Sequence, residues 1–189
     1  MSQATTRKHW SWEEYLDWEQ CQGRKYELVD GQVHAMVGGP GDHDSICNNL
    51  RSALLARLRG GPCRVQGPDL KLRANENVRY PDALIDCGPP VQGRLLAQEP
   101  VAVFGVLSRS TAWIDQTIKL RDYDSVASIR FYVLISQDEP RVLVYRRDES
   151  GRLAAHAAQL LEGLSAFLVL TDPDVTIPLQ NLFDGVEFG

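Results

Sequence analysis

The chain has 189 residues, of which 43% are hydrophobic and 24% charged, as in a soluble globular protein with room for one substantial core. No apolar run approaches the roughly 20 residues that span a bilayer, and the polar N-terminus lacks the apolar centre of a signal peptide. We therefore expect a cytoplasmic protein with no membrane partner. The formal charge of −5 argues against strong non-specific binding to nucleic acid, although it leaves room for a local basic groove.

The first half of the chain predicts a helix, a hairpin and a second, longer helix. We expect residues 1–9 to be a flexible tail and residues 10–189 to form a single domain. A helix capped by Ser11 fades near Gly23, and Asp30-Gly31 is a turn signal between strands at 25–29 and 32–37. The next helix opens at residues 42–45. Its apolar face is formed by Ile46, Leu50, Ala53, Leu54 and Leu58.

The second half predicts a series of strands around one more helix. Residues 75–77 read as a turn, and Thr111 is a good N-cap for a helix that carries Asp115 and Lys119. The predicted strands are 63–73, interrupted at Gly67-Pro68, then 80–86, 100–107, 131–135, 142–145 and 153–158, with a short apolar element at 167–170 and a tail beyond it. This order predicts an α/β domain with a mixed sheet flanked by helices.

The cysteines are widely spaced and form no Cys-x-x-Cys pair. A zinc site or a disulfide framework is therefore not expected. Buried free thiols are the expected state of most of them. They are Cys21, Cys47, Cys63 and Cys87.

Several short segments, in this order and spacing, resemble the Uma-type restriction endonuclease family, within the restriction-endonuclease-like PD-(D/E)xK superfamily. The resemblance runs from about Trp10 to the C-terminus. The segments that carry it are residues 26–31, His43, Asp69, residues 80–82, residues 106–111, Asp115 to Lys119 with Tyr123, the aromatic strand at Phe131, and Arg141-Val142.

The resemblance implies a restriction-endonuclease-like fold and a site for Mg²⁺ or Mn²⁺. Asp82 matches the metal-binding aspartate, and the carbonyl of Val106 would add a neutral ligand. Lys119 matches a catalytic lysine moved onto the helix after the second strand. Glu27 matches a further catalytic position, and His43 matches a position near the site.

The second metal-binding carboxylate of the family falls at Gly105, which has no side chain to bind with. A hard cation such as Mg²⁺ prefers oxygen ligands, so the loss of one anionic ligand weakens the site. Asp86 shares a strand face with Asp82 but lies roughly 13 Å along the strand. Glu27 and Asp69 come from other elements, and the sequence leaves open whether either replaces the missing carboxylate.

Each candidate also has a plainer alternative. Asp115 and Lys119 are four residues apart, the spacing of an ordinary surface helix pair. Glu27 alternates with apolar neighbours and fits a solvent-facing strand position equally well. We take His43 as a residue that stabilises the helix start, and Asp69 as a turn residue after Pro68.

Two functions follow from this pattern. The first is a metal-dependent endonuclease that hydrolyses phosphodiester bonds of DNA. The alternative is a catalytically dead protein that keeps the nuclease fold as a binding or scaffold module, because Gly105 removes a ligand. A homodimer formed through the apolar strands is a further alternative for its assembly.

Overall fold

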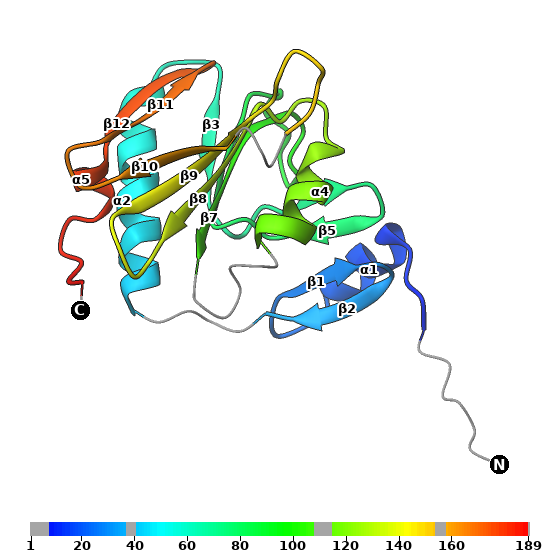
Figure 1. The fold of residues 1–189 in the computed structure, drawn as a ribbon. Coiled ribbons are helices and arrows are strands. Elements are labelled where there is room, and N and C mark those ends of the chain that lie inside the picture. Colours follow the sequence, from blue (N-terminus) through cyan, green and yellow to red (C-terminus); the bar gives the residue numbers. More distant parts are fainter. Residues whose placement is uncertain (1–7, 37–40, 108–114, 154–157, 189) are drawn as a thin grey trace.

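The chain folds around a mixed β-sheet, seen in a computed structural model that describes residues 8–36, 41–107, 115–153 and 158–188 (Figure 1). Within these residues, six strands form the central sheet in the order β10-β9-β8-β7-β6-β3. Their bounds are β3 (Arg64–Gln66), β6 (Ala83–Asp86), β7 (Pro100–Leu107), β8 (Phe131–Ser136), β9 (Arg141–Arg146) and β10 (Gln159–Glu162). β7 and β8 are parallel and the other neighbours antiparallel, so the predicted mixed α/β architecture is confirmed.

A smaller sheet lies beside the central one, with strand order β2-β1-β5-β4 in the described part of the chain. Its strands are β1 (Tyr26–Val29), β2 (Gln32–Ala35), β4 (Leu72–Ala74) and β5 (Asn77–Arg79). Asp30 and Gly31 have φ values of 47° and 72°, as the predicted hairpin turn requires. The helix α1 (Trp12–Glu19) packs on this sheet through the buried Tyr15.

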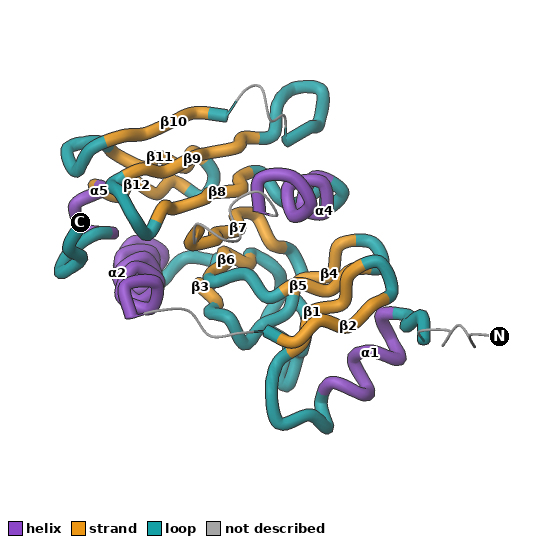
Figure 2. The backbone as a smooth tube through the Cα atoms, turned by 60° about the horizontal axis from the view of Figure 1, so that its bottom comes forward, coloured by secondary structure: helices purple, strands orange, loops and turns teal. Residues whose placement is uncertain are grey.

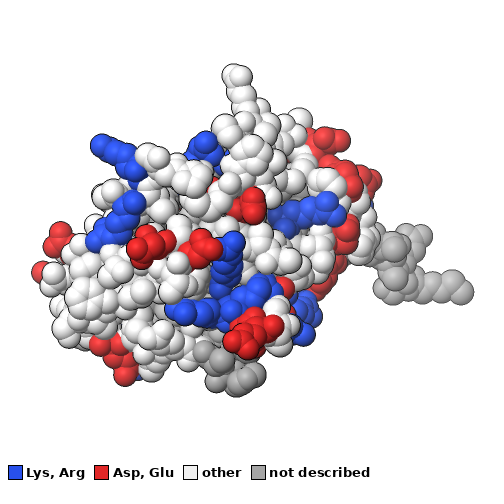
Figure 3. All heavy atoms as spheres, turned by 90° about the horizontal axis from the view of Figure 1, so that it is seen from above, with Lys and Arg blue, Asp and Glu red and all other residues white. Residues whose placement is uncertain are grey.

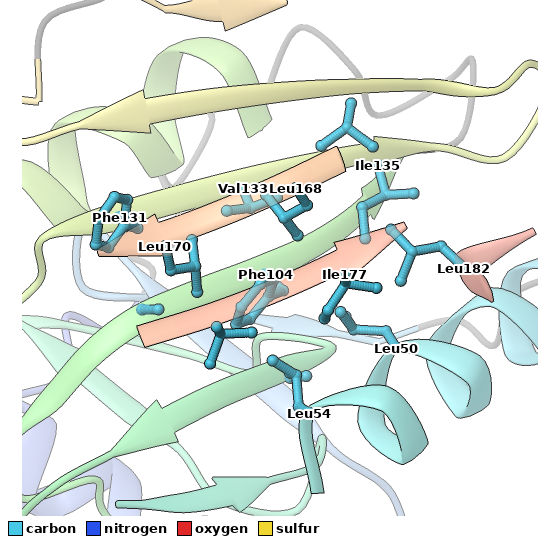
Figure 4. Close-up of a cluster of buried hydrophobic side chains, with 14 of the residues drawn as sticks. Leu50, Leu54, Phe104, Phe131, Val133, Ile135, Leu168, Leu170, Ile177 and Leu182 are labelled. Atoms are coloured by element: carbon cyan, nitrogen blue, oxygen red, sulfur yellow. The ribbon is translucent and has the colours of Figure 1, made fainter. Parts of the chain in front are cut away.

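The core lies mainly on the face of the central sheet covered by α2 (Gly41–Leu58) (Figure 4). A hairpin of β11 (Phe167–Thr171) and β12 (Asp174–Pro178), with the short helix α5 (Leu179–Leu182), covers the same face. Leu50 and Leu54 of α2 lie beside Phe104 of β7, as the predicted apolar face of this helix requires.

The opposite face is covered by a π-helical turn, η1 (Asp115–Lys119), and the helix α4 (Leu120–Asp124). Leu120 and Tyr123 pack there against Tyr132 and Leu134 of β8. Thr111, the predicted N-cap, lies outside the described residues. No helix in the described ranges is both long and apolar enough to cross a membrane.

Four predictions of secondary structure, for two strands, a turn and the C-terminal tail, were wrong in their boundaries. Residues 63–73 do not form one interrupted strand, because β3 and β4 belong to different sheets. The predicted strand at 80–86 starts only at Ala83, and the predicted turn at 75–77 ends in β5. The predicted C-terminal tail contains β12, whose buried Val175 and Ile177 alternate with exposed residues.

The cysteine prediction was also wrong, because Cys63 and Cys87 form a disulfide bond. β3 and β6 pair with Arg64 opposite Asp86, which places the two cysteines side by side at the ends of these strands. Spacing along the chain gives no sign of this pairing. Of the cysteines that the structure describes, Cys47 is a buried free thiol and Cys21 an exposed one.

Candidate functional site

Asp82 lies in a bend just before β6, at the point where that strand stops pairing with β7. Its backbone N–H donates to the Phe104 carbonyl at 3.2 Å, and its carboxylate Oδ2 accepts the Val106 N–H at 2.7 Å. The Asp82 side chain thus accepts the Val106 N–H, a bond that the backbone of β6 would have accepted if the strand were longer. This bond fixes the carboxylate beside β7 and leaves Oδ1 for another partner.

The first turn of α2 supplies that partner. His43 Nε2 lies 3.5 Å from Asp82 Oδ1, and His43 Nδ1 lies 3.6 Å from the sulfur of Cys47, one turn along the helix. Candidate donor atoms of the three residues all lie within 4.8 Å of one another. Figure 2 shows the arrangement of the elements that carry these residues, with α2 beside β3 and β6.

The charge state of His43 follows from these contacts. The hydrogen bond with Asp82, helped by that with Cys47 and opposed by partial burial, raises the pKa of His43 to about 10. At neutral pH the imidazole is therefore charged and forms an ion pair with Asp82. The resemblance matched His43 to a position near the site, and its side chain does contact Asp82, whereas the plainer alternative gave it only a role at the helix start.

Two further residues of α2 were missed in the sequence. Cys47 joins the cluster, and Arg51 Nη1 approaches the Asp82 carbonyl at 3.5 Å. His43, Cys47 and Arg51 follow one another at intervals of four residues, which places them on one face of the helix. This spacing could have indicated a polar face on the helix, but nothing in the sequence indicated that Asp82 would contact that face.

Glu27, on β1, is tied to the segment that leads into Asp82. Its Oε1 accepts the Tyr80 N–H at 3.1 Å, and its Oε2 lies 3.0 Å from Nη1 of the buried Arg79. The Glu27 side chain is only 14% exposed, so the solvent-facing alternative is wrong. These contacts hold the backbone just before Asp82 in place.

Arg79 also reaches the helix that follows Lys119. Its Nε and Nη2 donate to Asp122 Oδ2 at 2.9 and 2.6 Å, and Asn77 donates to Asp122 Oδ1 at 3.0 Å. Both charged side chains are almost fully buried, so Arg79 and Asp122 form a buried ion pair that connects β5 to α4. Lys119 ends η1, is half-buried and directly precedes α4. The buried Arg79–Asp122 ion pair therefore connects the helical segment that contains Lys119 to β5, the strand just before Asp82.

Gly105 stands on β7 opposite Leu134 of β8. A Cβ added to it would lie 3.2 Å from Leu134 Cδ2 and 3.9 Å from the Tyr132 hydroxyl oxygen. Its neighbours Phe104 and Val106 pack toward α2, so position 105 faces the other side of the sheet.

Asp69 and Asp86, the other carboxylates considered as metal ligands, pair with other residues. Asp69 is 91% exposed and pairs with Lys25. Asp86 is fully buried and pairs with Arg94 at 2.9 Å. It also accepts the backbone N–H groups of Gly88, Gln98 and Glu99. Neither contact set includes Asp82.

A separate cavity of about 830 Å³ opens beside α4. Its lining includes Asp30, Asn77, Arg121 and Asp124, while Asp82 and Lys119 are not among the lining residues. We therefore treat the Asp82 cluster, and not this cavity, as the candidate site.

Comparisons with known proteins agree with this fold. The Uma2 family, described as a putative restriction endonuclease, matches residues 12–179, which confirms the resemblance seen in the sequence. The chain is 33% identical over 142 residues to the uncharacterized protein slr1290 of Synechocystis sp. strain PCC 6803, covering 74% of this chain and 75% of that protein. A second uncharacterized protein of that organism, sll1609, is 25% identical over 139 residues, covering 71% and 78% of the two chains.

A solved structure extends the likeness in fold. The crystal structure of a putative nuclease belonging to DUF820 from Anabaena variabilis ATCC 29413 superposes with a TM-score of 0.76. The match covers 94% of this chain and 99% of that one, at 15% sequence identity. At that identity the likeness shows the fold alone.

Proposed function

Because this chain belongs to the Uma2 family of putative restriction endonucleases, we propose that it is a metal-dependent nuclease that hydrolyses phosphodiester bonds of DNA at Asp82. The observation that carries the proposal is the placement of Asp82. Its carboxylate is oriented by the Val106 amide and lies where β6, β7 and the first turn of α2 meet. A fixed and partly exposed carboxylate at the end of a strand is what a metal-assisted hydrolase needs.

The remaining residues take distinct roles in this proposal. The ammonium group of Lys119 would stabilise the charge that develops on the phosphate oxygens during hydrolysis. Glu27 acts as a positioning residue, since its contacts hold Arg79 and the Tyr80 amide. The Arg79–Asp122 pair keeps the helix of Lys119 against the same strand.

The donors present fit Mg²⁺ poorly. Mg²⁺ prefers an octahedral shell of oxygen ligands, usually with one or two carboxylates. Here Gly105 provides no carboxylate, one oxygen of Asp82 is bound to the Val106 amide, and among the described residues the metal-ligating side chains that cluster with Asp82 offer a nitrogen and a sulfur. Metal ligation by the Val106 carbonyl stays a prediction.

The test is a plasmid-nicking assay in separate buffers with Mg²⁺, Mn²⁺ and Zn²⁺. Asp82→Asn keeps an oxygen for the Val106 amide but removes the charge, so we expect a folded protein whose nicking falls at least about 100-fold. Asp69→Asn is the matched control, because it removes an exposed carboxylate outside the site. Nicking that persists unchanged in Asp82→Asn would refute the proposal.

Gly105 favours a second candidate, a non-catalytic module that retains the nuclease fold. Its motivation is the missing carboxylate and the apolar contact of position 105 with Leu134. In that case the wild-type protein nicks DNA with none of the three metals. Binding to a labelled duplex in a gel-shift assay then distinguishes a DNA-binding module from a scaffold.

The charge distribution bears on how DNA would be held. Figure 3 shows the end of the molecule opposite to the first turn of α2, where the described Lys and Arg side chains stand beside Asp and Glu. We propose that DNA approaches the end that carries Asp82, because the phosphate to be cleaved must reach that carboxylate. A cytoplasmic location and a homodimer both stay predictions.

A further inference from the structure

The cluster beside Asp82 contains donor types that the family resemblance did not suggest. His43 offers an imidazole nitrogen once a metal displaces the proton that it carries in the ion pair with Asp82, Cys47 offers a sulfur, and Asp82 offers a carboxylate oxygen. The three donor atoms lie within 4.8 Å of one another. Two of the three come from one face of α2, where positions four apart lie one above the other. A rigid helix therefore presents both side chains to the carboxylate fixed by Val106.

These distances suit a small tetrahedral ion. Zinc binds sulfur at about 2.3 Å and nitrogen or oxygen at about 2.0–2.2 Å, so neighbouring ligand atoms around it lie roughly 3.5 Å apart. With one ligand atom taken from each residue, the three donor atoms lie within 4.8 Å of one another, and His43 makes its 3.5 Å contact with Asp82 through Nε2 and its 3.6 Å contact with Cys47 through Nδ1. An ion takes only one of the two ring nitrogens, so the imidazole must turn and the Cys47 and Asp82 side chains must close in by about 1 Å to surround it.

The donor set also selects the kind of ion. Thiolate suits Zn²⁺ or Cu⁺, imidazole suits Zn²⁺ and several transition metals, and Zn²⁺ accepts carboxylate as well. Zinc is the divalent ion common to all three. Mg²⁺ is disfavoured by the sulfur and nitrogen donors.

Burial leaves one side of the cluster open. Cys47 is buried, whereas the His43 and Asp82 side chains are 22% and 26% exposed. Three protein ligands with one side open to solvent is the arrangement of catalytic zinc sites, which keep the fourth position for water or substrate. A purely structural site would close that position with a fourth side chain.

We propose that His43, Cys47 and Asp82 form a binding site for Zn²⁺ that takes the place of the family's two-carboxylate site. The inference rests on the proposed function in one respect, because it assigns the metal to the same Asp82 carboxylate. Metal binding itself can be measured without any nuclease activity.

The experiment is a titration of the full chain with Co²⁺, followed by displacement with Zn²⁺. A cysteine ligand gives Co²⁺ a thiolate charge-transfer absorption, and tetrahedral coordination gives it visible bands. We expect one Co²⁺ per chain, both absorptions, and their loss when one equivalent of Zn²⁺ is added. The titration is run without thiol reductant, which would compete for the metal and open the Cys63–Cys87 bridge.

Substitutions of the proposed ligands identify which side chains bind the metal. Cys47→Ser and Cys47→Ala should abolish the charge-transfer band and weaken binding at least about 100-fold, because even outer partners of metal ligands contribute about 10–100-fold. Cys21→Ser, at the exposed free cysteine, is the matched control and should change neither quantity. Thermal unfolding without metal confirms that each variant is folded, and His43→Gln provides an independent loss of a ligand.

The outcomes separate this site from the nuclease proposal. Binding that depends on Cys47 supports the site even if the protein nicks no DNA. Nicking that depends on Asp82, together with no Co²⁺ band or a band unchanged in the folded Cys47→Ala variant, overturns the site and leaves the nuclease standing.

Discussion

Arg79 and Asp122 are bonded through two hydrogen bonds to a single carboxylate oxygen, at 2.9 and 2.6 Å, in the interior of the molecule. The first residue lies three positions before Asp82 and the second three positions after Lys119. This pair therefore connects the two chain segments that carry the proposed chemistry. Figure 1 shows the same relationship, with α4 next to β5.

Loss of this pair should destabilise the fold. Asp122→Ala leaves the Arg79 charge buried with Glu27 as its remaining partner, and removing one partner of a buried pair costs about 3–5 kcal/mol. Urea denaturation measures the change in unfolding free energy. Glu76→Ala removes a surface pair with Arg73 and should cost less than about 1 kcal/mol. Equal losses of unfolding free energy in the two variants would contradict a stabilising role of the buried Arg79–Asp122 pair.

Asp86 should give the stability a defined pH dependence. Burial raises its pKa, but three backbone N–H groups and Arg94 outweigh burial, so the pKa of folded Asp86 lies below the ordinary value of 3.8. Its contribution is therefore complete above about pH 4 and is lost as pH falls through the lower folded value. Asp86→Asn should cost about 3 kcal/mol at pH 7 and progressively less below pH 4.

Urea denaturation of wild type and Asp86→Asn from about pH 7 down to pH 3 checks this dependence. Asp69→Asn is the control, because its carboxylate is exposed and its ion pair with Lys25 contributes little. A difference between wild type and Asp86→Asn that stays constant with pH would show that the charge of Asp86 is not responsible.

Lys119 should matter for catalysis and not for metal binding. Lys119→Gln removes the charge proposed to stabilise the phosphate oxygens, so nicking should fall about 100-fold or more. Arg121→Gln, at an exposed position of α4, should have little effect. Co²⁺ binding should be unchanged in both variants. A parallel loss of metal binding in Lys119→Gln would instead indicate that the substitution disturbs the site as a whole.

Position 105 should control the preference for metal. Gly105→Glu places a carboxylate on the residue after Phe104, whose carbonyl binds the Asp82 amide, on the face of β7 away from α2, and Leu134 must shift by a few tenths of an ångström to admit it. We expect Mg²⁺ affinity to rise about tenfold, equivalent to about 1.4 kcal/mol. Calorimetry with Mg²⁺ measures the change.

Gly105→Gln provides the matched control, since it adds the same volume without the charge. Similar Mg²⁺ affinities of the two variants would mean that a carboxylate at 105 does not reach the ion. Mg²⁺-dependent nicking that appears only in Gly105→Glu would show that the second ligand is all that separates this chain from the two-carboxylate site.

The sequence by itself determined the parts whose pattern is local. Asp30-Gly31 predicted its hairpin because both residues accept positive φ, and the apolar spacing from Ile46 to Leu58 predicted the buried face of α2. The apolar run at 100–107 predicted a strand buried on both faces, which is β7. The family resemblance pointed to Asp82 and Lys119.

Only the tertiary structure decided which of these elements meet. Periodicity tells which face of a helix or strand is buried, but the partner of that face depends on strand register and on the packing of distant segments. For this reason the contact of His43 with Asp82, the Cys63–Cys87 bridge and the Arg79–Asp122 pair were not predicted. The choice between zinc and magnesium rests on the same long-range contacts, because it depends on the donors that surround Asp82.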